Sequence, residues 1–325
     1  MYLRMSHSPT AEPVPSSPVT IGGAERLRTI ASGGCAAAFA SIFRYAVALA
    51  RHSTPKRCVV FVLRAMIYFR ATIRWIRFLE YYGVKYGLGA PPLDVVRKSL
   101  STHLVHGASP DRTIALLRNH LFVAEAYFGQ DLRRALWNGD TVAIARIEGK
   151  RAVYRVDLCR ADCAGARHEG ELTVAISDGT LPRPLFRVTF TLYRSGRGRS
   201  TVVIGGLQGS GLDDAKAAMV AATRDLGGLR PKDALLLVLK GLAARMGAQE
   251  LYAVSNATHV INRRRQRRRL LKLADYDSYW QDRGGHEGAP FGYVLPIGDL
   301  HLATPAANRR EAVKRRFAEI GFHLA

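Results

Sequence analysis

The segment between Thr201 and His259 limits the fold of this chain more than any other, because it places a helix start at Pro231 between two apolar strands. The helix continues to about Met246, and the second apolar run ends at Val254. This order predicts two strands of one sheet that are joined by a helical connection. The helix start and the strand end are then the expected places for a ligand, since both expose unpaired backbone groups.

A run of short alternating segments precedes this unit. Apolar and polar residues alternate over 172–176 and 188–192, with turn-forming sequences between the segments, which predicts an antiparallel meander. Residues 61–140 instead show helical spacing. We therefore predict an α+β protein with a disordered and helical extension in residues 1–60, a helical region in 61–140, and a mixed β-sheet with helices in 141–325.

The net charge restricts the choice of partner. The chain has 325 residues, with 48 Lys and Arg against 26 Asp and Glu, a net charge of +22 and a pI near 10.4. Such a surface attracts polyanions, which include anionic lipid, lipopolysaccharide, acidic protein and nucleic acid. The excess is mostly arginine, so a bias in codon composition is an alternative explanation that stays open.

The densest positive charge lies in Arg263–Arg269. No helix-turn-helix, zinc-finger or aromatic RNA-binding signature accompanies this run, so nucleic acid is disfavoured as a partner. A solvated basic helix face is the simplest interpretation, although arginine also suits the binding of phosphate or carboxylate groups.

Residues 58–79 suggest contact with a membrane surface. Arg70, Arg74 and Arg77 follow helical spacing and share one face, while apolar residues occupy the opposite face. A helix of this kind either lies on an anionic membrane or packs on the core of its own protein, and both interpretations stay open. We expect no secretory signal and no membrane-spanning run, hence a cytoplasmic protein or one held peripherally at the inner membrane.

The four cysteines predict neither a disulfide framework nor a metal centre. Cys35, Cys58, Cys159 and Cys163 are few and scattered, and no second ligand pair accompanies the last two. We expect free thiols and no bound metal, which fits a cytoplasmic location.

The order of elements resembles the GNAT acyltransferase fold, in which a meander leads into a strand, a helix start and a further strand. The resemblance implies that N–H groups at the helix start hold the pyrophosphate of an acyl-CoA cofactor. The matching residues are Gly228, Arg230 and Lys232, which add positive charge to a helix N-terminus. The usual glycine-rich loop is absent, and an additional helix over 213–226 intervenes. The alternative is that Pro231 only starts a helix whose cations are solvated.

Asn256, His259 and Tyr276 are the candidate catalytic residues. Asn256 and His259 lie three residues apart, so one helical turn would place them on the same face. A histidine there can act as a general base, an asparagine can orient a carbonyl, and a tyrosine hydroxyl can donate a proton. The alternative is structural: Asn256 caps a helix, His259 packs on the sheet, and Tyr276 belongs to an aromatic corner.

Across roughly residues 75–320 the chain also resembles the VirK/YbjX family of bacterial proteins. The matching positions are Gly206-Leu207-Gln208-Gly209, Gly228, Arg230-Pro231-Lys232, Val254-Ser255-Asn256, His259, Tyr276-Asp277, Trp280 and the run Gly292-Tyr293-Val294-Leu295-Pro296. The resemblance implies a link to virulence, the cell envelope and tolerance of antimicrobial peptides. It supplies neither a reaction nor catalytic residues.

Two functions follow as hypotheses. The first is an acyl-CoA-dependent, GNAT-like transferase for an envelope-related acceptor, in which Arg230 and Lys232 bind the cofactor phosphates and His259 or Tyr276 handles the acceptor proton. The second is a non-catalytic basic protein that binds anionic envelope components or escorts client proteins. A parting of two strands beside residue 230 would favour the first. The sequence identifies neither the acceptor nor the oligomeric state.

Overall fold

The computed structural model describes residues 35–179, 181–196, 198–211, 214–261 and 275–325. Residues 41–325 form one compact unit. The predicted extension lies outside the described residues as far as residue 34, and so does the Arg263–Arg269 run. The boundaries predicted at residues 60 and 140 stay predictions. In the described parts of the chain, no helix has the length and apolar character needed to cross a membrane.

Helices occupy the described sequence before the sheet, in agreement with the helical spacing. They are α2 (Cys35–His52), α3 (Pro55–Ile67), α4 (Phe69–Lys85), α5 (Leu93–Lys98), α6 (Pro110–Tyr127) and α7 (Gln130–Asn138). Helix α6 begins where a proline follows a capping residue, because the Ser109 hydroxyl accepts a hydrogen bond of 3.2 Å from the Arg112 N–H. The apolar face of α4 is core, since Trp75 and Ile76 are fully buried.

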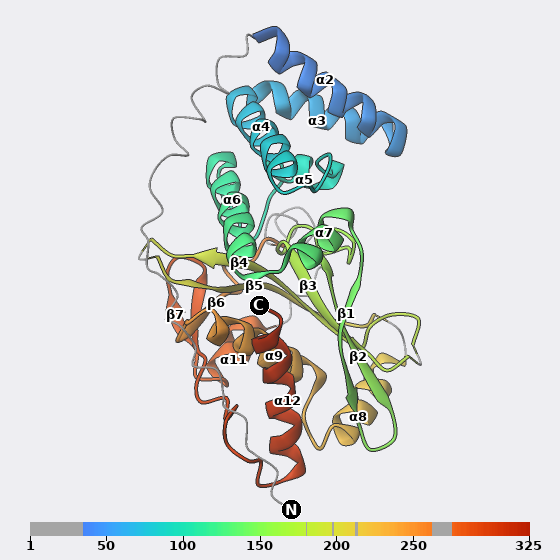
Figure 1. Cartoon of the computed structure of the whole chain (residues 1–325), viewed down its shortest axis with the longest axis vertical. Helices are drawn as coiled ribbons and strands as arrows, with labels where there is room; N and C mark the ends of the chain where they lie inside the picture. Colours follow the sequence, from blue (N-terminus) through green and yellow to red (C-terminus); the bar gives the residue numbers. More distant parts are fainter. Residues whose placement is uncertain (1–34, 180, 197, 212–213, 262–274) are drawn as a thin grey trace, which may run out of the picture. The chain divides into compact units, whose positions relative to one another are not determined.

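A mixed sheet follows, with the strand order β1-β2-β3-β4-β5-β6-β8-β7 (Figure 1). The strands are β1 (Val142–Glu148), β2 (Val153–Arg160), β3 (Leu172–Ser177), β4 (Phe186–Arg194), β5 (Ser200–Gly209), β6 (Glu250–Val254), β7 (His286–Gly288) and β8 (Gly292–Pro296). Neighbouring strands are antiparallel, apart from the parallel pair β5–β6. The predicted α+β class and the meander are confirmed.

Helices α8 (Ala215–Asp225) and α9 (Pro231–Arg245) connect β5 to β6 and allow these strands to run parallel. Helix α9 packs beside the C-terminal helix α12 (Arg309–His323) on the apolar face of the sheet (Figure 1). The two helices approach closely at glycines: a Cβ at Gly241 would lie 1.9 Å from the Ala318 carbonyl oxygen. On the opposite face, α6 covers β4, where His120 Nδ1 accepts a hydrogen bond of 3.2 Å from the Leu192 N–H.

The parallel pair is short, because β6 ends soon after it. The paired residues are Val203 with Tyr252 and Ile204 with Ala253. Strand β5 continues along β4 to Gly209, whereas β6 ends at Val254. The register between β4 and β5 skips Gly205, which marks a bulge where the parting begins. Beyond Ile204, β5 therefore has no partner in β6, and this region at the end of β6 is called here the strand parting.

Candidate functional site: a polar pocket and the strand parting

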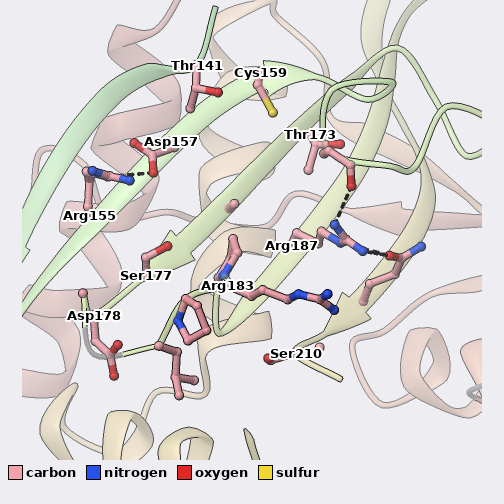
Figure 2. A pocket seen from close by; sticks show the side chains of 18 of the residues that line it. Thr141, Arg155, Asp157, Cys159, Thr173, Ser177, Asp178, Arg183, Arg187 and Ser210 are labelled. Carbon is pink, nitrogen blue, oxygen red and sulfur yellow. Dashed lines mark hydrogen bonds and ion pairs between the residues drawn. The ribbon is translucent and has the colours of Figure 1, made fainter. Parts of the chain in front are cut away.

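The polar face of the sheet contains a pocket of about 700 Å³, called here the sheet pocket (Figure 2). Strands β1 to β5 line it, together with the loop between β3 and β4 and the end of β5. Its charged side chains are Arg146, Arg155, Asp157, Asp178, Arg183 and Arg187. Four arginines against two aspartates make the pocket electropositive, and its volume suits a small-molecule ligand.

Strand register explains why residues so far apart in the sequence meet in this pocket. Asp157, Ala175, Arg187 and Gln208 are successive Cα partners across four strands. Side chains directly opposite one another in a sheet project to the same face. The small side chain of Ala175 therefore leaves open space between Asp157 and Arg187.

The four arginines differ in how much of their hydrogen-bonding capacity the protein uses. Arg155 Nε donates to Asp157 Oδ2 at 2.8 Å, and Arg187 Nε donates to Gln208 Oε1 at 2.9 Å (Figure 2). Arg146 and Arg183 are exposed, and neither forms an ion pair with a described residue. Two guanidinium groups are therefore available for a ligand that carries negative charge.

Gln208 links the sheet pocket to the strand parting. Its Nε2 donates to Glu169 Oε1 at 2.6 Å, and Glu169 lies against two glycines of β5. A Cβ at Gly205 would lie 1.8 Å from the Glu169 carbonyl oxygen, and a Cβ at Gly206 would lie 1.9 Å from its Oε2. The Gly206-Leu207-Gln208-Gly209 motif thus combines a close approach that needs glycine with an amide that joins Arg187 to Glu169.

Tyr276 contacts β5 and Trp280 contacts the end of β6 at the strand parting. Both belong to the short helix α11 (Tyr276–Gln281) and are buried. The Leu207 N–H donates to the Tyr276 hydroxyl at 3.1 Å, and Trp280 Nε1 donates to the Val254 carbonyl at 2.9 Å. Burial raises the pKa of Tyr276, so its hydroxyl keeps its proton at neutral pH. The parting therefore holds a proton donor bonded to a β5 backbone group.

His259 lies against Tyr276 with the two rings tilted by 31° and their centroids 4.9 Å apart, and it is 1% exposed. Its Nδ1 accepts a hydrogen bond of 3.1 Å from the Ile261 N–H, which places the proton of the neutral ring on Nε2. Burial lowers the pKa of His259 to about 4, against a smaller opposing effect of the Gly205 backbone. The imidazole is therefore neutral at pH 7, a weak base, and shielded from solvent.

Asn256 fastens α11 to the end of β6. Its backbone N–H donates to Asp277 Oδ1 at 2.8 Å, its Nδ2 donates to Asp275 Oδ1 at 3.0 Å, and its Oδ1 accepts from the Tyr276 N–H at 3.0 Å. The three candidate catalytic residues thus lie together. The hydrogen bonds of Asn256 position Tyr276. The catalytic role of the three residues stays a prediction.

The predicted cofactor residues lie at the start of α9. Gly228 has a left-handed backbone, with φ of +83°, and Arg230 is exposed. Lys232 Nζ lies 4.3 Å from the centre of the Tyr279 ring, and burial lowers its pKa. Tyr279 also donates to Asp233 Oδ1 at 2.9 Å. Helix α11 therefore touches both the end of β6 and the start of α9, and Lys232 is already used in a cation–π contact.

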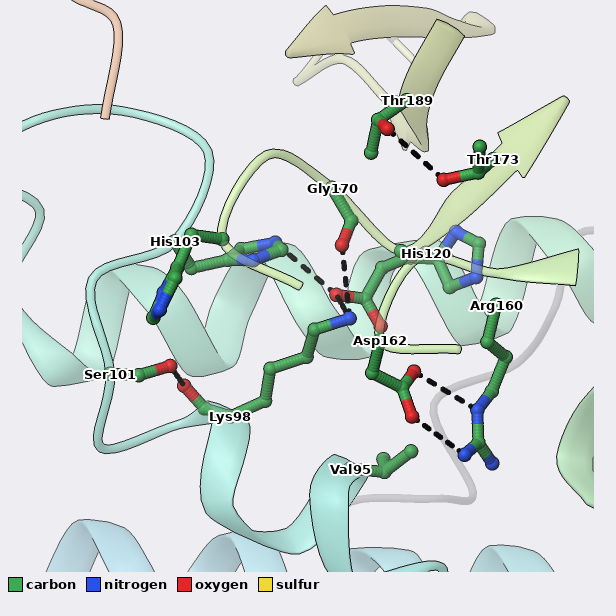
Figure 3. A network of polar contacts seen from close by, with 12 residues as sticks. Val95, Lys98, Ser101, His103, His120, Arg160, Asp162, Gly170, Thr173 and Thr189 are labelled. Atoms are coloured by element: carbon green, nitrogen blue, oxygen red, sulfur yellow. Dashed lines mark hydrogen bonds and ion pairs between the residues drawn. The ribbon is translucent and has the colours of Figure 1, made fainter. Parts of the chain in front are cut away.

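A second polar cluster lies inside the protein, away from solvent (Figure 3). Lys98 Nζ lies 2.8 Å from Glu171 Oε1 and donates to the Gly170 carbonyl at 2.9 Å. His103 Nε2 lies 3.4 Å from the same Glu171 oxygen, and Arg160 pairs with Asp162 at 2.7 Å. Lys98 is 3% exposed, so this cluster joins α5 to the sheet rather than facing a ligand.

Sequence reasoning missed the sheet pocket, although part of its signal was present. Arg155 and Asp157 lie two residues apart on a strand, which places both on one face. Gln208 belongs to the motif that carries the family resemblance. No local pattern connects these residues to Arg183 or Arg187, because their meeting depends on the register of four strands.

Comparison with known proteins identifies the family of this chain. The family described as "Protein of unknown function (DUF535)" matches residues 51–320. The chain belongs to this family, and the predicted family resemblance is confirmed. It is similar to the "Uncharacterized protein YbjX" of Escherichia coli (strain K12), with 28% identity over 264 residues, which cover 79% of this chain and 78% of the relative. No solved structure matches the chain.

Proposed function

We propose that the protein binds an anionic ligand, with phosphate or carboxylate groups, in the sheet pocket. The observation that carries this proposal is the pair of exposed arginines, Arg146 and Arg183, beside a pocket whose remaining arginines are already oriented by Asp157 and Gln208. Planar guanidinium groups bind phosphate and carboxylate in a bidentate manner, and a preorganised pocket loses less entropy when it binds. We further propose a role at the cell envelope and in tolerance of antimicrobial peptides, in which the bound ligand is an anionic envelope component.

Inorganic pyrophosphate is the probe for this proposal. Titration calorimetry at low salt is expected to give saturable binding, and Arg183→Ala is expected to weaken it by on the order of tenfold, because a hydrogen bond to a charged group is worth about 1.5–3 kcal/mol. Arg199→Ala is the matched control, since Arg199 is an exposed arginine of the β4–β5 turn outside the pocket. Equal weakening by both variants, or no binding by the wild type, would contradict the proposal.

Acyl transfer is the second candidate, and the strand parting is the observation that favours it. The Leu207 N–H lies beyond the last β5–β6 pair and bonds a tyrosine hydroxyl rather than a strand. If the Tyr276 side chain rotated away, an acyl thioester carbonyl could accept the hydrogen bond from Leu207. The acceptor would attack that carbonyl, the C–S bond would break, Tyr276 would give its proton to the departing thiolate, and the proton that the acceptor loses would return to the Tyr276 oxygen.

Two observations make acyl transfer the second candidate. His259 is 1% exposed and has a pKa of about 4, so it reaches no acceptor until Tyr276 moves. Lys232 lies over the Tyr279 ring, which leaves Arg230 as the exposed cation at the α9 start. This second proposal therefore includes acyl-CoA as the cofactor. Its catalytic residues are His259, Tyr276 and Asn256.

A thermal-shift series with CoA, acetyl-CoA and a long-chain acyl-CoA tests the transferase. Ligand at a hundredfold excess over its Kd is expected to stabilise the fold by about 2.7 kcal/mol. Arg230→Ala is expected to reduce that shift, while Arg199→Ala leaves it unchanged. An unchanged melting temperature of the wild type at millimolar concentrations of all three ligands would exclude acyl transfer and leave binding in the sheet pocket untouched.

A further inference from the structure

Helix α3 exposes apolar side chains on the face that ordinarily carries polar ones. Phe61 and Ala65 form its buried face. The α3 stripe, defined as the exposed apolar residues of this helix, comprises Val59 (57% exposed), Val60 (39%), Leu63 (58%), Met66 (45%) and Ile67 (71%). Their spacing of three and four residues gathers them on one side of the helix. A contiguous apolar patch of this kind marks an interaction surface.

The chain segment that contains the α3 stripe carries charge of a single sign. Residues 35–79 contain no Asp or Glu; their basic residues are Arg44, Arg51, Lys56, Arg57, Arg64, Arg70, Arg74 and Arg77. Arg44 pairs with Glu80 and Arg74 with Asp111. Arg51, Lys56, Arg57 and Arg70 are exposed and form no ion pair with any residue in the described part of the chain.

A basic cavity of about 390 Å³ adjoins the stripe at the start of α3. Val60 belongs to both, so apolar and cationic surfaces are continuous. The basic residues that line the cavity are Lys56, Arg57, Arg64, Arg97, Lys98 and Arg167, against Asp94 as its acidic residue. Asp94 pairs with Arg97 at 3.0 Å, and Lys98 pairs with Glu171, which leaves Lys56 and Arg57 without an acidic partner among the described residues.

We propose that α3 docks on the surface of an anionic lipid bilayer, with the stripe in the acyl-chain boundary and a lipid phosphate in the basic cavity. A lipid combines the two chemistries that adjoin here, an apolar chain and an anionic headgroup. An acidic protein surface would match the cations but would leave the apolar stripe without a partner. A purely apolar protein surface would leave Lys56 and Arg57 facing uncharged groups. Interfacial helices bind by this combination of apolar burial and attraction to anionic lipid.

Vesicle co-sedimentation of the full chain tests this docking. Vesicles of phosphatidylcholine with phosphatidylglycerol are expected to bind the protein, and vesicles of phosphatidylcholine alone are expected not to. Leu63→Glu is expected to reduce binding on the order of tenfold, because it removes apolar burial and adds a repelled charge. Lys56→Gln and Arg57→Gln are each expected to reduce binding about fivefold, because this is the contribution of one cation to the affinity for an anionic membrane surface.

Val84→Glu is the matched control, because Val84 is an exposed apolar residue of α4 (83% exposed) outside the stripe. It is expected to bind vesicles as the wild type does. A loss as large as that of Leu63→Glu would overturn the proposal, and so would equal binding to neutral and anionic vesicles or none to either.

Sedimentation velocity without lipid separates the lipid surface from a second copy of the chain. The wild type and Leu63→Glu are expected to have the same sedimentation coefficient. A wild-type dimer that Leu63→Glu dissociates would assign the stripe to self-association and overturn the lipid assignment. Arg183 lines the sheet pocket, and the Arg183→Ala variant is expected to bind vesicles as the wild type does. Failure of the lipid proposal is therefore distinguishable from failure of the pocket proposal.

Discussion

Replacing Glu171 by leucine is expected to lower the free energy of unfolding by about 3–5 kcal/mol, because it leaves a buried ammonium without its counter-ion. Lys98 is 3% exposed, and its remaining partner is the Gly170 carbonyl at 2.9 Å. Burial also raises the pKa of Glu171, and the Lys98 ammonium opposes that rise. In the folded state, the charge of Lys98 therefore stabilises the charge of Glu171, and the charge of Glu171 stabilises that of Lys98. Urea unfolding followed by circular dichroism measures the loss.

Two further variants distinguish this mechanism from general disruption of the core. Lys98→Met combined with Glu171→Leu is expected to recover most of the lost stability, since no buried charge then lacks a partner. Arg74→Ala breaks a pair whose side chains are 69% and 73% exposed, and it is expected to cost less than about 1 kcal/mol. A double variant as unstable as Glu171→Leu alone would show that packing, and not the unpaired charge, determines the effect.

The fold was predictable where residues that contact each other lie close in the sequence. Strands β3 and β4 alternate apolar and polar residues, and the predicted meander follows from that pattern. Strand β7 was not predicted, because it has three residues and exposes His286 and Glu287, so it shows no apolar alternation. The Lys98–Glu171 pair was also missed, since a lysine in a helical segment gives no sign that it will be buried.

The candidate site was predictable in part for the same reason. Asn256 and His259 were chosen by their three-residue spacing and Tyr276 by the chemistry of its hydroxyl, and in the structure the Asn256–Tyr276 hydrogen bond and the His259–Tyr276 ring contact bring them together. Which of them faces solvent depends on how α11 closes the strand parting, and sequence does not encode that directly. The sheet pocket depends on register across four strands, so Asp157 and Arg187 become neighbours only once the sheet has formed.

Mild acid is expected to unfold this protein, because three histidines are buried in the neutral form. Burial lowers the pKa of His120 to about 3 and of His259 to about 4, and it holds the pKa of His103 well below 6.5. In the unfolded chain each histidine titrates near 6.5. The unfolded state therefore binds more protons once the pH falls below that value, and stability is full above pH 6.5 and declines below it.

The decline should be steep. Each buried histidine contributes up to about 1.4 kcal/mol per pH unit, so the three together contribute up to about 4 kcal/mol per unit below pH 6. Glu171 opposes part of this decline, since burial raises its pKa and the folded state therefore binds the Glu171 proton more readily as the pH falls. Urea midpoints between pH 7.5 and pH 5 measure the net slope. His120→Gln is expected to flatten it by about a third, whereas His286→Gln, at an exposed position, leaves it unchanged. A wild-type midpoint that is constant from pH 7.5 to 5 would contradict the neutral, buried state of these histidines.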